Sequence, residues 1–179
     1  MAGIDPDLLP QGLPDGWVAG TGKSLGAMVV GLRPSGEMHL GPTEWRLLSD
    51  ELMLAGVDDL GDLYVTNLVK SQTDTALLRE GHFEAAVPYL VEEVQRTVPK
   101  YVLALGQDVF QILTGTSLEL PLYRGIWQRL ADVFDWDVAL VLGTFDPAYV
   151  LENPGKIGPF RRDVQEFATA WQARIEGLR

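Results

Sequence analysis

The residues best suited to chemistry in this chain follow three short apolar segments. They are residues 31–36 (GLRPSG), Thr66-Asn67 and residues 144–147 (TFDP). An asparagine amide both donates and accepts hydrogen bonds, a carboxylate such as Asp146 accepts them, and a guanidinium such as Arg33 donates them. If the fold brings these segments together, they can form a small polar binding site.

The apolar segments themselves are typical of buried strands, and amphipathic segments lie between them. The pattern predicts strands at 27–32, 62–68, 101–105 and 137–142, and helices at 41–56, 83–98, 106–114 and 161–178. Strands that alternate with helices favour parallel pairing, and ligands bind beyond the carboxyl ends of such strands. We therefore predict an α/β fold of three α/β/α layers around a central four-stranded, mostly parallel sheet.

Composition limits the size and the location of the protein. A chain of 179 residues with 46% hydrophobic content can bury one core. We expect residues 27–179 to form that domain and the Pro- and Gly-rich residues 1–26 to form an N-terminal arm. The chain has neither the roughly 20 consecutive apolar residues of a membrane span nor a secretory signal at its start. We therefore expect a cytoplasmic protein without a membrane partner.

Charge and cysteine content exclude several kinds of site. The formal net charge of −11 argues against tight, extended DNA binding but allows a small basic rim. The chain has no cysteine, which excludes disulfides, zinc–thiolate sites and cysteine-ligated iron–sulfur clusters. Its two histidines, His39 and His82, have no partner at metal-ligand spacing. We expect no metal and no cofactor.

Five motifs of the chain, in order and with fitting spacing, resemble those of the uracil-DNA glycosylase superfamily, especially its prokaryotic iron–sulfur branches, families four and five. The first is GLRPSGE, which is similar to Gly-x-x-Pro-Gly or Gly-Leu-Ala-Pro. The second is LYVTNLVKSQ, which resembles Y-[IV]-T-N-x-V-K-C, and the third is VPKYVLALGQDVFQILTG, which resembles P-K-x-[IV]-[IV]-x-L-G-x-x-A. The fourth is a recurrent Arg-Gly at Arg124, and the fifth is GTFDPAYVLENP, which resembles T-[YF]-H-P-x-Y-L-L-R-N-P.

The resemblance covers residues 27–171 and implies a pocket for a base flipped out of DNA. Asn67 would bind the hydrogen-bonding edge of the base, although capping a strand end is an alternative role. His39, or Trp45 in its place, would stack on the base. Backbone amides of the first loop would face a base oxygen or the attacking water, and this loop comprises Leu32, Arg33, Pro34, Ser35 and Gly36.

The resemblance also implies a surface that contacts DNA. Val150 lies where relatives insert an apolar wedge into the gap left by the flipped base, and plain packing is its alternative role. The residues implied to contact DNA are Lys70, Arg124, Pro147 and Val150.

The chain departs from the superfamily where chemistry would occur. Leu32 occupies the position of a water-activating carboxylate in many relatives, which leaves Glu37 as the closest candidate. Asp146 replaces a histidine that would stabilise negative charge on the departing base. A carboxylate prefers an amino-bearing or cationic partner, so this replacement weakens the expectation of uracil as the substrate.

Two further departures concern the cluster and the DNA surface. Ser71 and Ala86 occupy positions where cluster cysteines are expected, so hydrophobic packing would have to hold that region. Glu152 replaces an arginine and places a negative charge where a phosphate would lie.

Two hypotheses follow for the function. The first is a DNA glycosylase, a hydrolase that cuts the N-glycosidic bond of a uracil-like or modified base during DNA repair. Asp146 and Glu37 would be its catalytic residues, and its partner would be single-stranded DNA or a duplex with a flipped base. The second is a catalytically inactive relative that binds a nucleobase, a nucleotide or a protein. An unrelated activity on the same fold stays open, because a fold does not fix a function.

Overall fold

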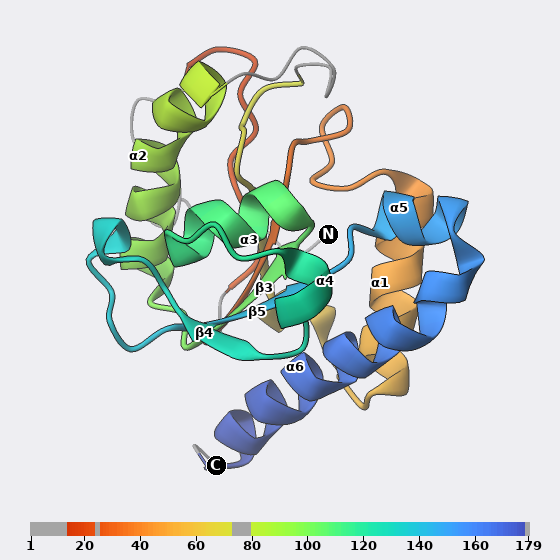
Figure 1. Cartoon of the computed structure of the whole chain (residues 1–179). Helices are drawn as coiled ribbons and strands as arrows, with labels where there is room; N and C mark the ends of the chain where they lie inside the picture. The colour runs from red at the N-terminus through yellow and green to blue at the C-terminus, as the bar shows by residue number, and fades with distance from the viewer. Residues whose placement is uncertain (1–13, 24–25, 73–79, 178–179) are drawn as a thin grey trace.

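The centre of the molecule is a twisted β-sheet with helices on both sides (Figure 1). This computed structural model describes residues 14–23, 26–72 and 80–177. Within those residues the sheet has five strands in the order β2-β1-β3-β5-β4, and β4 alone is antiparallel to its neighbour. The strands are β1 (Ala27–Gly31), β2 (Tyr64–Asn67), β3 (Tyr101–Leu105), β4 (Trp127–Arg129) and β5 (Leu140–Thr144). The predicted α/β fold and the three layers are confirmed, with one strand more than the sequence indicates.

The helices form the outer layers. Figure 1 shows α1, α5 and α6 gathered at one side of the sheet and α2 and α3 at the other. The α-helices are α1 (Pro42–Leu54), α2 (Glu80–Thr97), α3 (Gln107–Thr114), α4 (Leu120–Tyr123), α5 (Pro147–Glu152) and α6 (Ile157–Gly177), and short 3-10 helices are η2 (Leu60–Asp62), η4 (Asp132–Phe134) and η5 (Pro154–Lys156). In the part of the chain that the structure describes, no helix combines the length and the apolarity needed to cross a membrane.

The core lies where apolar stripes of the helices meet the sheet. Helix α6 shows the pattern well, because its buried residues recur every three or four positions, as a helix with one apolar face requires. Each such side chain stabilises the fold by about 1.5–3 kcal/mol through burial. The buried residues of this stripe are Phe160, Val164, Phe167, Ala168 and Trp171.

The structure corrects several predicted boundaries and adds a strand that was not predicted. The strand predicted at 137–142 begins later and ends at Thr144, because its glycine lies in close contact with α3 rather than at a turn. A Cβ at Gly143 would lie 2.6 Å from side-chain atoms of both Phe110 and Leu120. Strand β4 has three residues, too few for an alternating pattern to show. Helix α1 begins at Pro42, one residue later than predicted, and no side chain caps its start.

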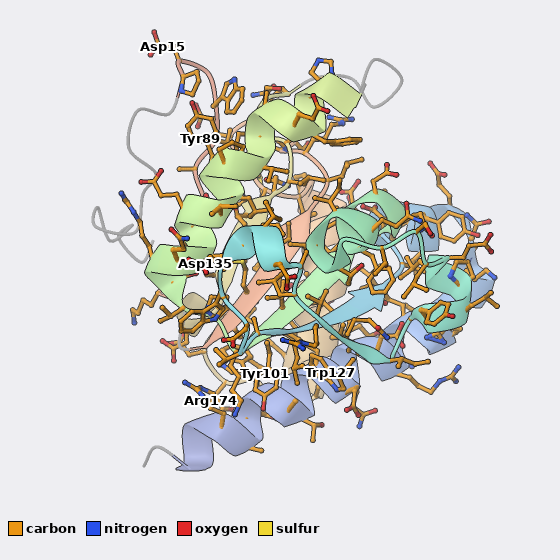
Figure 2. All side chains as sticks on the ribbon, turned by 60° about the vertical axis from the view of Figure 1, so that its left-hand side comes forward. Asp15, Tyr89, Tyr101, Trp127, Asp135 and Arg174 are labelled. Atoms are coloured by element: carbon orange, nitrogen blue, oxygen red, sulfur yellow. The ribbon has the colours of Figure 1, made fainter. Side chains whose placement is uncertain are left out.

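The described part of the N-terminal arm, residues 14–23, runs along the outer strand β2. Thr21 and Val65 exchange two backbone hydrogen bonds of 2.8 and 2.7 Å, and the Val18 amide donates to the Lys70 carbonyl at 2.8 Å. The Trp17 ring lies against Tyr89, near the middle of α2, with centroids 5.2 Å apart, and Figure 2 shows Asp15 on the same side of the molecule as Tyr89. Residues 1–13 and 24–25 of the predicted arm lie outside the described residues.

A buried ion pair joins the arm, β2 and α2. Lys70 and Glu93 are both fully buried and bonded to each other, and Thr66 bonds to both, at 2.6 Å to Lys70 and 2.8 Å to Glu93. The Gly20 amide of the arm donates to the other Glu93 oxygen at 2.9 Å. Burial lowers the pKa of Lys70, and the carboxylate of Glu93 opposes that shift. These hydrogen bonds offset the cost of removing two charges from water.

We predict that Glu93→Gln destabilises the protein by about 3–5 kcal/mol, because it leaves the Lys70 ammonium buried without its counter-charge. Urea unfolding measures the effect. The double variant Lys70→Met with Glu93→Leu should regain most of the loss. The control is Asp50→Asn in the exposed pair with Arg46, whose nitrogen and oxygen lie 3.8 Å apart; its cost should stay below about 1 kcal/mol. If Glu93→Gln and Asp50→Asn lowered the free energy of unfolding equally, the stabilising role of the buried Lys70–Glu93 pair would be contradicted.

Candidate functional site

A first hollow lies where the predicted strand ends converge, beyond the carboxyl ends of β1 and β5. We name it the Asp146 hollow, and its volume is about 170 Å³. The first loop and the start of α5 therefore share a wall, as the sequence predicts for these segments. The lining residues are Leu32, Arg33, Pro34, Ser35, Leu40, Gly41, Glu44, Asp146 and Ala148.

Asp146 is held firmly in this hollow. It lies two residues after the end of β5 and caps α5, because its Oδ1 accepts the backbone N–H of Ala148 at 2.8 Å. Gly106 passes close behind it, and a Cβ there would lie 3.5 Å from the Asp146 Cβ. Burial raises the pKa of Asp146 and the charge of Glu44 acts in the same direction, whereas the backbone bonds and Arg33 act against it. The carboxyl group is therefore fixed in place and more readily protonated than an ordinary aspartate.

A second hollow lies between α1 and the outer strand β2, and Leu40 belongs to the walls of both hollows. We name it the His39 hollow, and its volume is about 250 Å³. Glu37 lies here, at an exposed position, and so not in the wall of the Asp146 hollow. The lining residues are Thr21, Glu37, Met38, His39, Leu40, Trp45 and Val65.

Asn67 and His39 are bonded to each other twice. The Asn67 Nδ2 donates to the His39 carbonyl at 2.8 Å, and the Asn67 Oδ1 lies 2.9 Å from the His39 Nδ1. Asn67 is fully buried, and His39 is 8% exposed. In this conformation the Asn67 amide is therefore engaged by the chain itself and does not face a ligand.

The register of the sheet makes room for this contact. Gly31 and Asn67 are paired at the ends of β1 and β2. A Cβ at Gly31 would lie 2.9 Å from the Asn67 Nδ2 and 3.2 Å from a Leu40 side-chain carbon. Only glycine leaves the Asn67 amide in its observed position.

The four residues predicted to contact DNA lie in different environments. Lys70 is fully buried in the ion pair with Glu93, so its ammonium is not on a surface that a phosphate can reach. Arg124 bonds to Asp163 and, at 3.3 Å, to the Pro159 carbonyl, which joins the end of α4 to α6.

The last two of these residues begin and pack helix α5. Pro147 is buried at the start of the helix. Val150 is 2% exposed, whereas its neighbours Tyr149 and Leu151 are each 42% exposed. Val150 therefore packs in the core in this conformation, and an apolar side chain offered to DNA from α5 would be one of its neighbours.

A family model described as the uracil DNA glycosylase superfamily matches residues 17–173. The chain belongs to the uracil-DNA glycosylase superfamily. It is also similar to a type-4 uracil-DNA glycosylase of Pyrobaculum aerophilum, with 30% identity over 164 residues that cover 84% of this chain and 81% of the relative. The match with the superfamily begins inside the arm, at Trp17, which agrees with the packing of that residue on α2.

The residues present do not fit the iron–sulfur cluster that the resemblance to families four and five implies. The chain has no cysteine, and the expected ligand positions hold Ser71 and the fully buried Ala86. The sequence predicts hydrophobic packing there, and Ala86 conforms to it. The adjoining Lys70–Glu93 pair adds a polar connection that was not predicted.

Sequence reasoning missed Glu44, which brings a second carboxylate into the Asp146 hollow. Its carboxylate folds back over Gly41, since a Cβ at Gly41 would lie 2.3 Å from a Glu44 oxygen. Its place in the sequence could have indicated this role. An acidic residue in the first turn after Gly41-Pro42 lies at the amino end of a helix, and its side chain reaches back toward the start of that helix.

We predict that Gly31→Ala destabilises the protein by about 1–3 kcal/mol, because the added methyl group displaces the Asn67 amide and strains a packed region. Urea unfolding gives the stability, and the NMR signals of the His39 ring should change with it. The control is Gly158→Ala in α6, where a Cβ meets nothing within 4 Å; it should be neutral or slightly stabilising. A Gly31→Ala variant with wild-type stability and unchanged His39 signals would refute this role of Gly31.

Proposed function

We propose that the protein is a DNA glycosylase that hydrolyses the N-glycosidic bond of a modified base in DNA. The observation that carries the proposal is the superfamily match over residues 17–173 together with a hollow at the carboxyl ends of the strands. The base would bind in the Asp146 hollow, against the first loop, which supplies Leu32 and Ser35 to its wall.

The two carboxylates of the hollow suit the two proton transfers of this hydrolysis. Asp146, whose pKa burial raises, would donate a proton to the base as the bond from C1′ to the base nitrogen breaks. The half-buried Glu44 would accept a proton from the water whose oxygen bonds to C1′. Two carboxyl groups in unequal environments commonly divide the roles of acid and base in this way. In this proposal Glu44 is the second catalytic carboxylate in place of the predicted Glu37.

The groups in the hollow also bear on which base is bound. Glu44 is an acceptor when ionised, Asp146 becomes one once it has given its proton to the base, and Arg33 is the cation in the same wall. Such a pocket favours a base with an exocyclic amino group or a positive charge over the uracil anion. We therefore propose an amino-bearing or cationic modified base as the substrate.

A limited surface around α5 would contact DNA. Tyr149 and Leu151 offer exposed apolar side chains for the gap left by the flipped base. Lys156 lies nearby, with its Nζ 5.5 Å from the centre of the Phe145 ring. The net charge of −11 favours a small footprint with strong salt dependence rather than an extended one.

The second candidate function is a base- or nucleotide-binding protein without catalysis. One observation favours it specifically, namely that the Asn67 amide already bonds to His39 through both its oxygen and its nitrogen. Calorimetry with free bases and nucleotides tests it. Binding without release of base from any DNA would support this candidate over the glycosylase.

The test of the glycosylase is base release from single-stranded and duplex oligonucleotides that carry uracil, hypoxanthine, 3-methyladenine or 7-methylguanine. We expect abasic sites, and least activity on uracil. Asp146→Asn and Glu44→Gln should each lower the rate about 10²–10⁴-fold, the usual contribution of a general acid or base. Asp50→Asn, exposed in α1, should keep wild-type activity. Absence of abasic sites with every base would eliminate the proposal.

We predict that Asp146→Asn is at least as stable as the wild type at pH 7–8, because an asparagine still caps α5 and has no charge to bury. The folded-state pKa of Asp146 is raised, so the wild type binds a proton more readily when folded and gains stability as the pH falls. The advantage of the variant should therefore shrink between pH 7 and pH 4 in urea unfolding. If the stability of the variant relative to the wild type were lowest at high pH, the raised pKa of Asp146 would be contradicted.

A further inference from the structure

A buried polar cluster joins the end of β5 to α4 and α6, directly before Asp146 in the chain. Its centre is Asp163 of α6, which is 2% exposed. One Asp163 oxygen bonds to the guanidinium of Arg124 at the end of α4. The other accepts the hydroxyl of Thr144, the fully buried last residue of β5, at 2.8 Å. One carboxylate therefore connects three elements of the fold.

Each member of this cluster depends on the others. Burial raises the pKa of Asp163, and the hydrogen bonds from Arg124 and Thr144 act against that shift. A carboxylate away from water is costly unless charged and hydrogen-bonding partners compensate it. Removal of either donor therefore disturbs the carboxylate that the other donor holds.

Arg124 makes a second contact, with the residue that precedes Asp146. Its guanidinium carbon lies 5.5 Å from the centre of the Phe145 ring. Phe145 is 8% exposed, and Tyr149 of α5 packs on the same ring with centroids 5.6 Å apart. A planar guanidinium can bond to a carboxylate and lie over an aromatic ring at the same time. Arg124 thus holds Phe145 directly and Thr144 through Asp163.

The start of α3 holds the same segment from another direction. The Thr144 carbonyl accepts the N–H of Gly106 at 2.9 Å. A Cβ at Gly106 would lie 3.5 Å from the Asp146 Cβ, so this bond keeps the chain before α3 against the Asp146 side chain. Asp146 itself is half-buried. The position of Thr144 therefore bears on how much water reaches the Asp146 carboxyl group.

We infer that Arg124 and Asp163 are positioning residues for Asp146. They hold Thr144 and Phe145, and so keep the Asp146 carboxyl group at the wall of its hollow and shielded from water. The inference rests on the proposed function, because a proton transfer is what makes the exact position of this group matter for a rate.

The effect would pass through the backbone rather than through direct charge. The wall of the Asp146 hollow, as far as the described residues form it, includes neither Arg124 nor Asp163. The charges that act on the Asp146 carboxyl group are those of Glu44 and Arg33. A change in Asp146 on substitution of Arg124 or Asp163 would therefore report a change of position and burial.

Carbon NMR of the labelled full-length protein tests the positioning without any substrate. The signal of the Asp146 carboxyl group is the one that disappears in Asp146→Asn. Thr144→Val replaces the hydroxyl that Asp163 holds by a methyl group, so we expect Asp146 to titrate at lower pH than in the wild type as water reaches it. Thr144→Ser keeps the hydroxyl and should restore the wild-type titration. An unchanged Asp146 titration in Thr144→Val would overturn the inference.

The kinetics of base release distinguish positioning from DNA contact at Arg124. Arg124→Lys keeps the charge but not the planar fork. A lysine can replace an arginine at a phosphate, so a DNA contact would leave kcat at its wild-type value. If Arg124 positions Asp146, kcat should fall about 10–100-fold, the scale of a misplacement of about 1 Å, while KM stays near its wild-type value. Wild-type kcat in Arg124→Lys would overturn the inference even if Thr144→Val fails to fold.

A control separates positioning from loss of stability. Val94→Ala removes packing from the fully buried side of α2, outside the cluster. It should lower the stability in urea unfolding but leave the Asp146 titration and kcat unchanged. If Val94→Ala moved the Asp146 titration as far as Thr144→Val does, the specific role of the cluster would be refuted.

The two readouts separate this inference from the proposed function. A lowered Asp146 titration in Thr144→Val without base release from any DNA leaves the positioning role standing and removes the glycosylase. Base release that requires Asp146 but proceeds at the wild-type rate in Thr144→Val and Arg124→Lys leaves the glycosylase standing and removes the positioning role.

Discussion

The buried pair of Lys70 and Glu93 is the constraint on which the site depends. It joins the arm, β2 and α2 through hydrogen bonds to Gly20 and Thr66. Thr66 directly precedes Asn67, so the pair fixes the end of β2 and, through Asn67, the orientation of the His39 ring. Removing two charges from water is costly, and the geometry of the bonds must repay that cost. The chain meets this requirement in the region where its iron–sulfur relatives would have cysteine ligands.

The candidate site lies on a chain of the uracil-DNA glycosylase superfamily, and the polar groups of its two hollows bear on which ligand they can bind. Two carboxyl groups, those of Asp146 and Glu44, line one hollow, and a third, that of Glu37, lines the other. Each of these groups is complementary to a donor on the ligand, whereas a uracil anion presents acceptors. In the proposed function the scaffold would position the base and these few side chains would select it, because a shared fold does not settle a shared substrate.

Local patterns in the sequence were enough to predict most elements of the fold, whereas contacts between distant residues were not visible. Strand β3 agrees with its predicted limits because its apolar residues are contiguous. Strand β5 does not, since Gly143 looks like a turn signal until its contact with Phe110 is known. The first loop and Asp146 could be predicted to converge from the rule for strand ends. The burial of Lys70 could not be predicted, because its partner Glu93 is 23 positions away in the sequence. The contact between His39 and Asn67 could not be predicted either, because these residues are 28 positions apart.

The pairing of the arm with β2 has a consequence for the behaviour of the protein in solution. An outer strand carries unpaired backbone groups that can recruit a strand from another molecule and begin aggregation. Thr21 occupies those groups at Val65, and Val18 occupies the carbonyl of Lys70. At the opposite edge of the sheet, β4 is only three residues long, which limits its capacity as a template. The arm therefore protects the sheet from intermolecular strand addition, in addition to supplying a wall of the His39 hollow.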